Sequence, residues 1–132
     1  MTGEQADAAA DDGDIAGQAR PSTALAAYGS LRPGEPNHWV VNRIKGTWVP
    51  GVVRGWVFEL TFGPAEGYDG FVPDPDGGEV EVDVLVGPDL EKRWREIDDF
   101  EGPGYERRTI DVMLTSGETI EASVYVALTE AD

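Results

Sequence analysis

Short apolar runs separated by glycine and proline dominate the chain from Thr23 onward. The 132 residues include 17 glycines and 9 prolines, and both residue types favour turns between short extended segments. This punctuation is typical of a strand-rich fold. Because the length fits one domain of ordinary size, we expect a single small domain over residues 23–132.

An alternation of apolar and mostly polar residues, with a period of two, predicts the strands. The clearest case is the run of four alternating valines that ends at Val86. The last two strands flank a Thr-Ser-Gly-Glu turn and predict a hairpin, whereas residues 63–78 are interpreted as a loop. The expected strands cover residues 24–31, 46–60, 80–86, 108–114 and 119–128.

Two short segments have helical spacing instead. Residues 36–44 follow a Pro-Asn start and predict about two turns. After Gly87-Pro88-Asp89, the residues Leu90, Trp94 and Ile97 follow the i, i+4, i+7 pattern, and Gly102 is placed to end a helix of about twelve residues. The predicted fold class is therefore α+β: a small mixed β-barrel of about five to seven strands with two short helices.

Residues 1–22 have a different composition, rich in Ala, Asp, Gly and Gln, with Ile15 as the one large aliphatic residue after Met1. Such a segment buries too little apolar surface to offset its ordering entropy. We expect a disordered acidic N-terminal tail, which is also a weak candidate for contact with a basic partner.

Charge and cysteine content exclude several functions. Ten Lys and Arg stand against 26 Asp and Glu, a net charge of -16, which repels phosphate backbones and anionic lipid surfaces. Without cysteine the chain has no thiolate nucleophile and no Cys-ligated metal site, and a single histidine, His38, makes metal ligation or a Ser-His-Asp triad a poor hypothesis. We expect no nucleic-acid or membrane partner, no metal and no cofactor. Since no signal peptide or membrane span is apparent, we expect a cytoplasmic protein.

The first candidate site is the turn Tyr28-Gly29-Ser30-Leu31, at the end of a predicted strand. A Gly-Ser turn there can direct several backbone N–H groups at one point, which suits a carboxylate or an oxyanion. An ordinary strand-to-loop turn explains the same residues, and spacing alone does not decide between the two.

The second candidate is Glu101, near the end of the predicted second helix. At 100° per residue it returns to within about 20° of the apolar stripe that begins at Leu90. Burial, the neighbouring acids Asp98 and Asp99, and the negative end of the helix dipole would all raise its pKa. A Glu that exchanges a proton near neutral pH suits general acid/base catalysis. The alternative is that the helix ends before Glu101 and the acids form a solvated cap.

Taken together, these two motifs resemble those of the γ-glutamylcyclotransferase-like superfamily, in particular its AIG2-like and γ-glutamylamine cyclotransferase branch. The resemblance rests on the Tyr28–Leu31 turn with the later Gly34-Glu35-Pro36-Asn37-His38, followed by Asp98-Asp99-Phe100-Glu101-Gly102 and Tyr105-Glu106-Arg107. It covers roughly residues 24–128. One departure is Glu81, which stands where relatives usually place a glycine.

The resemblance implies a barrel-like α+β fold and an enzyme that needs no cofactor. Its substrate would be a small γ-glutamyl-amine or γ-glutamyl-amino acid, cyclised to 5-oxoproline with release of the free amine. It implies that Glu101 is the general acid/base, and that Tyr105 and the turn bind the substrate. The turn residues are Tyr28, Gly29, Ser30 and Leu31. We expect a monomer or weak homodimer. The alternative is a non-catalytic module that binds a small metabolite in the same cavity.

Overall fold

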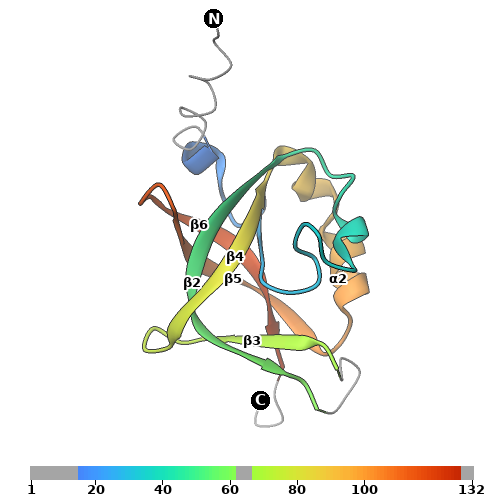
Figure 1. Cartoon of the computed structure of the whole chain (residues 1–132). Helices are drawn as coiled ribbons and strands as arrows, with labels where there is room; N and C mark the ends of the chain where they lie inside the picture. The colour runs from blue at the N-terminus through green and yellow to red at the C-terminus, as the bar shows by residue number, and fades with distance from the viewer. Residues whose placement is uncertain (1–14, 62–66, 129–132) are drawn as a thin grey trace, which may run out of the picture.

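A computed structural model describes residues 15–61 and 67–128, and these form a closed barrel of five strands with a sixth strand added at one side (Figure 1). The strand order is β3-β2-β4-β1-β6-β5, and β5 pairs back to β2. The pairing of β1 with β6 is parallel, and the others are antiparallel. The strands are β1 (Ala24–Ala27), β2 (Thr47–Glu59), β3 (Asp69–Pro73), β4 (Gly78–Val86), β5 (Tyr105–Leu114) and β6 (Thr119–Ala127).

The barrel closes through a short contact between β2 and β5. Only Gly51 and Val52 of β2 pair there, with Leu114 and Met113. A Cβ at Gly51 would lie 2.8 Å from Val112 Cγ1 and 2.9 Å from the Met113 carbonyl oxygen. The missing side chain therefore lets the two strands approach, at the Pro-Gly step where the sequence predicts a bend.

Two apolar layers lie on the two faces of the barrel wall. The interior is filled by alternate residues of the strands, among them Phe71, Val84 and Val124, each fully buried. The outer layer packs β1, β4 and β6 against the helical segments through Leu25, Leu85 and other residues. Since β1 contributes to both layers, all four of its residues are buried, which explains why its sequence is a continuous apolar run.

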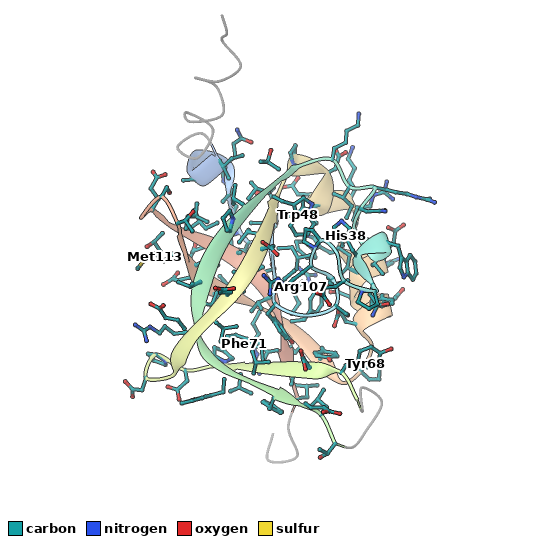
Figure 2. The ribbon with its side chains drawn as sticks, in the orientation of Figure 1. His38, Trp48, Tyr68, Phe71, Arg107 and Met113 are labelled. Carbon is teal, nitrogen blue, oxygen red and sulfur yellow. The ribbon has the colours of Figure 1, made fainter. Side chains whose placement is uncertain are left out.

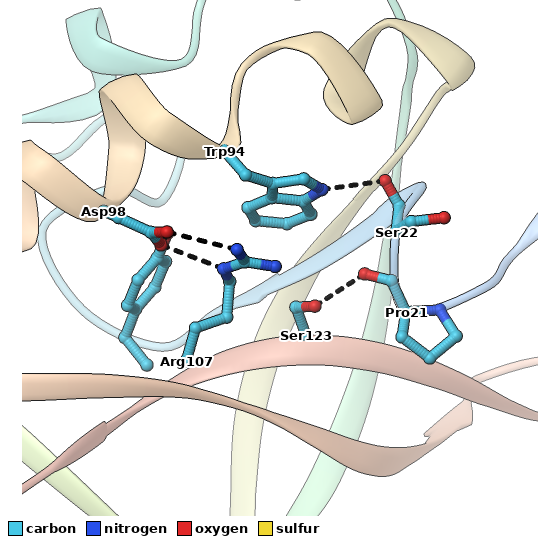
Figure 3. A network of polar contacts seen from close by, with 7 residues as sticks. Pro21, Ser22, Trp94, Asp98, Arg107 and Ser123 are labelled. Carbon is cyan, nitrogen blue, oxygen red and sulfur yellow. Dashed lines mark hydrogen bonds and ion pairs between the residues drawn. The ribbon is translucent and has the colours of Figure 1, made fainter.

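Three helical segments cover the outer layer. They are the 3-10 helices η1 (His38–Val40) and η2 (Pro88–Lys92) and the α-helix α2 (Trp94–Glu101). In α2, Trp94 and Ile97 face the barrel. The Trp94 indole N–H donates to the Ser22 carbonyl oxygen at 2.9 Å, and the Arg107 guanidinium of β5 lies 4.4 Å from the centre of the Trp94 ring (Figure 3). These contacts fix α2 against the chain before β1 and against β5.

The predicted α+β barrel is confirmed, and the alternating segments form β4 and the β5–β6 hairpin. The structure differs in four places. The first strand, expected over residues 24–31, ends at Ala27, where the chain enters the 28–31 turn. The expected loop over 63–78 contains β3, the expected helix over 36–44 is the three-residue η1, and a break at Arg93 divides the second helix into η2 and α2. Within the described ranges, no helix is long and apolar enough to cross a membrane.

Most of the predicted N-terminal tail, residues 1–14, lies outside the described residues. Residues 15–18 are helical, and Ile15 is buried with the residues of the barrel interior. The Thr23 hydroxyl donates to the Gln18 carbonyl oxygen at 2.9 Å. The packed part of the chain therefore includes residues from Ile15 onward, earlier than the expected start at residue 23.

Candidate active site

A small cavity lies where the end of β1 meets the end of α2 and the beginnings of β3 and β5. Its volume is about 40 Å³. It brings together both candidate motifs, which are about seventy residues apart in the sequence. The lining residues are Leu25, Ala26, Ala27, Tyr28, Gly29, Ser30, Leu31, Tyr68, Asp69, Glu101, Tyr105 and Tyr125.

The 28–31 turn lines this cavity and has backbone N–H groups without a partner in the described part of the protein. Within the described ranges, the N–H groups of Gly29, Ser30 and Leu31 donate no hydrogen bond to the protein. Three consecutive N–H groups at the edge of a cavity form an arrangement that attracts an anion. This geometry supports the interpretation of the turn as a binding element.

The returning loop holds the turn in place. The Asn37 side-chain amide donates to the Ser30 hydroxyl oxygen at 2.9 Å, and the Asn37 backbone N–H donates to the Ser30 carbonyl oxygen at 3.0 Å. His38 Nδ1 lies 2.9 Å from the Leu31 carbonyl oxygen, and its ring packs on Trp48 at 5.3 Å between centres (Figure 2). His38 therefore supports the turn. No group of three or more metal-ligating side chains occurs within the described ranges.

Glu101 is the last residue of α2, and Gly102 ends the helix with a φ of 81°. Its carboxyl group follows Trp94 and Ile97 on the face that packs on the barrel, as the stripe predicts. Burial raises the pKa of Glu101 from 4.5 to about 7. No hydrogen bond or ion pair with another described side chain reaches its carboxylate. The group can therefore gain or lose a proton near neutral pH.

Three tyrosines surround Glu101. The Tyr28 hydroxyl donates to the Tyr125 carbonyl oxygen at 2.8 Å, and the Tyr105 hydroxyl donates to the Asp69 carbonyl oxygen at 2.8 Å. Burial raises the pKa of Tyr105 to about 12, with a smaller contribution from the Glu101 charge. Burial likewise raises the pKa of Tyr28. Both phenols are neutral at physiological pH, so Glu101 is the group in this cavity suited to proton transfer.

Asp98, one turn before Glu101, has the opposite electrostatics. Arg107 donates two hydrogen bonds to its carboxylate, at 2.9 and 3.1 Å (Figure 3). The Tyr125 hydroxyl donates a third at 2.7 Å. The hydrogen bonding from Arg107 holds the pKa of Asp98 below 3.8. Of the causes expected from the sequence, burial is the one that raises the pKa of Glu101.

All six predicted site residues line the one cavity: Tyr28, Gly29, Ser30, Leu31, Glu101 and Tyr105. Sequence reasoning missed Tyr68, Asp69 and Tyr125, which reach it from β6 and from the beginning of β3. Tyr125 lies in an alternating strand and gives no separate indication of a role. Glu81 is exposed and pairs with Val52 across β4 and β2. It faces away from the buried valines of β4.

A family model described as gamma-glutamyl cyclotransferase, AIG2-like, matches residues 25–132. The chain belongs to this family. The matched range includes the 28–31 turn and Glu101. A comparison with curated proteins gave no match.

Solved structures support the same fold. The chain is similar to an AIG2-like protein from Mus musculus, with 22% identity and a TM-score of 0.60 over 83% of this chain and 80% of that one. A protein from Arabidopsis thaliana has 26% identity and a TM-score of 0.63 over 83% and 71%. YkqA from Bacillus subtilis has 24% identity and a TM-score of 0.62 over 80% and 35%.

Proposed function

We propose that this protein cyclises a γ-glutamyl-amine or γ-glutamyl-amino acid to 5-oxoproline and releases the free amine. Membership of the cyclotransferase family supports the reaction class. The observation that carries the proposal is the Glu101 carboxyl group, whose burial raises its pKa to about 7 in a cavity that also presents unpaired backbone donors. Burying a carboxyl group without a partner is costly, and general acid/base catalysis gives a reason for that cost.

The cavity would hold the reacting end of the glutamyl group, with the chain folded so that its α-amine approaches the γ-carbonyl carbon. The N–H groups of residues 29–31 suit a carboxylate or a carbonyl oxygen that becomes negative during the reaction. The rings of Tyr28 and Tyr105 form walls beside Glu101. Holding the α-amine close to the γ-carbonyl carbon supplies acceleration by proximity, because both reacting groups belong to one molecule.

In the proposed reaction, the Glu101 carboxylate accepts a proton from the substrate's α-ammonium group. The freed amine attacks the γ-carbonyl carbon and forms the new C–N bond of a five-membered ring. The bond from that carbon to the departing nitrogen then breaks as Glu101 returns the proton to this nitrogen. The regenerated carboxylate takes the second proton of the former ammonium group from the ring nitrogen and passes it to the released amine. The products are 5-oxoproline and a free amine, with no water consumed, and the carboxylate is regenerated.

The test is an assay for 5-oxoproline after incubation with γ-glutamyl-ε-lysine and a panel of γ-glutamyl-amino acids. We expect product with the unaltered protein and a loss of at least about a hundredfold in Glu101→Gln, within the typical contribution of general acid/base catalysis. Asp99→Asn is the matched control, because Asp99 is an exposed acid on the same helix. A fully active Glu101→Gln would refute the catalytic role. Thermal stabilisation by a panel member without product would favour the binding module.

A further inference from the structure

A larger groove adjoins the cavity that contains Glu101. Its volume is about 440 Å³, and it extends from the 28–31 turn across the loop that carries Glu35. Five residues line both spaces: Tyr28, Gly29, Ser30, Tyr68 and Asp69. The shared residues form the boundary, so a molecule that reacts at Glu101 can continue into this outer groove.

The difference in volume indicates which part of a substrate lies in the cavity that contains Glu101 and which part lies in the outer groove. A cavity of about 40 Å³ accommodates roughly three water-sized groups at about 10–15 Å³ each. Glu101 lines this cavity and is not among the residues of the outer groove. The reacting end of a γ-glutamyl substrate therefore belongs inside, and the substituent on the departing nitrogen belongs in the outer groove.

The described charges of the outer groove favour a cation. Arg32 is paired with Asp83, at 2.8 Å between Nε and Oδ2. Glu35 and Asp69 are exposed, and neither carboxylate forms an ion pair with another described residue. Among the described lining residues, the one cation, Arg32, is therefore paired with Asp83, and the charges of Glu35 and Asp69 are not compensated.

Asp69 lies at the boundary itself. Its Cβ is 3.8 Å from the position that a Cβ on Gly29 would take, and its charge raises the pKa of both Tyr28 and Tyr105, after larger contributions from burial. Next to it, the Tyr68 ring is 53% exposed, on the side of the molecule that carries α2 (Figure 2). An exposed aromatic face beside a carboxylate attracts an ammonium group.

We propose that the outer groove binds the leaving amine and selects amines that carry a second positive charge, such as diamines and polyamines. This inference rests on the proposed cyclotransferase reaction. The second ammonium group takes no part in the bond changes, which remain those described above. Glu35 and Asp69 act as specificity-determining residues by attracting it.

The experiment compares three substrates of similar length that differ in charge: the γ-glutamyl conjugates of 1,4-diaminobutane, n-butylamine and 4-aminobutyrate. We expect kcat/KM to decrease in that order, with the diamine conjugate about tenfold above the butylamine conjugate at low salt. This magnitude corresponds to about two- to fivefold for each exposed carboxylate. The ratio should shrink as salt is raised, because ions screen exposed charges.

Glu35→Gln and Asp69→Asn, which remove charge and keep shape, should each lower the ratio of the two kcat/KM values two- to fivefold. Glu118→Gln, in the exposed β5–β6 turn, is the matched control and should leave the ratio unchanged. Thermal unfolding of each variant checks that the fold is retained.

Three results would overturn the inference. Equal turnover of the three conjugates, or a ratio that neither groove substitution changes, would overturn the charge selection alone. Turnover of none of them, together with no product from the wider γ-glutamyl panel, would overturn the proposed function and the inference with it.

Discussion

The side-chain amide of Asn37 donates a 2.9 Å hydrogen bond to the hydroxyl oxygen of Ser30, in the turn that lines the candidate active site. Because the Ser30 oxygen accepts this bond, its own proton remains free to be donated to a bound molecule. Asn37 is therefore a positioning residue, seven positions along the chain from the group it orients.

We predict that Asn37→Asp lowers kcat/KM about tenfold, mainly through KM. A carboxylate at this position accepts the Ser30 proton instead of donating to its oxygen, which removes that proton from the substrate. The backbone bond from residue 37 to the Ser30 carbonyl oxygen does not depend on the side chain, so the fold should be retained. Asn42→Asp, at an exposed position of the same loop, is the control. Unchanged kinetics in Asn37→Asp would show that Ser30 does not contact the substrate.

The ion pair between Asp98 and Arg107 connects α2 to β5 and predicts a pH-dependent contribution to stability. Arg107→Ala removes two hydrogen bonds to a carboxylate and the contact with Trp94, and we expect the free energy of unfolding to fall by about 1–2 kcal/mol at pH 7. Since the pKa of Asp98 is held below 3.8 in the folded protein, this stabilisation is present above that pH and is lost as the pH falls through the lowered value.

The measurement is urea unfolding of both proteins between pH 7 and pH 3. The difference between them should shrink toward the acid end. Arg95→Ala removes an exposed guanidinium from α2 and should cost less than about 0.5 kcal/mol. A difference of constant size at every pH would mean that the packing on Trp94, and not the ion pair, accounts for the effect.

Gly70 lies where β3 passes close to the end of β6. A Cβ there would be 2.8 Å from Ala127 Cβ and within 3.3 Å of the Leu60 side chain. We predict that Gly70→Ala destabilises the protein by about 1–3 kcal/mol and also lowers activity, because the neighbouring Asp69 lines the cavity. Gly78→Ala, where nothing lies within 4 Å of the added carbon, is the matched control. Equal melting temperatures for the two variants would contradict the close packing at Gly70.

How far the sequence predicts this molecule depends on the range of the interactions. The alternating valines of β4 and the hairpin of β5 and β6 are specified by neighbours in the chain, as is the stripe that turns Glu101 toward the barrel. By contrast, β3 contains only Phe71 and Val72 as large aliphatic or aromatic residues, and it is a strand because it pairs with β2.

The same limit applies to the candidate site. Glu101 and the 28–31 turn were predicted from local pattern and from the resemblance. Asp69 and Tyr125 reach the cavity only through the topology of the barrel. The ion pair that lowers the pKa of Asp98 likewise depends on the position of Arg107, nine residues along the chain on a different element.

The pKa of Glu101 predicts a pH dependence of the reaction. If the carboxylate accepts the first proton, kcat/KM should fall about tenfold per pH unit as the pH drops below about 7. The measurement is the rate of 5-oxoproline formation from pH 5 to pH 9. At higher pH the rate should fall again as the substrate's α-ammonium group loses its proton, because the proposed reaction begins from the ammonium form. A rate that stays constant between pH 5 and pH 7 would exclude Glu101 as the initial base.

The burial that raises the pKa of Glu101 also destabilises the folded protein when this carboxyl group is charged. Its pKa is 4.5 ordinarily and about 7 when folded, so the folded state holds this proton more tightly than the unfolded state. The stability that the neutral form provides is complete below pH 4.5 and is lost as the pH rises toward and through about 7. Above that pH range, the charged carboxylate lowers the free energy of unfolding by about 3 kcal/mol.

We therefore predict that Glu101→Gln, which cannot ionise, is more stable than the unaltered protein at pH 8, by up to about 3 kcal/mol, and that this advantage disappears near pH 4.5. Thermal or urea unfolding at the two pH values measures it, with Asp99→Asn as the control that should show no such pH-dependent gain. An inactive but more stable variant is the outcome expected of a residue retained for chemistry and not for packing. Equal stability differences at both pH values would mean that the carboxyl group is solvated in the folded protein, and the proposed proton transfer would lose its physical basis.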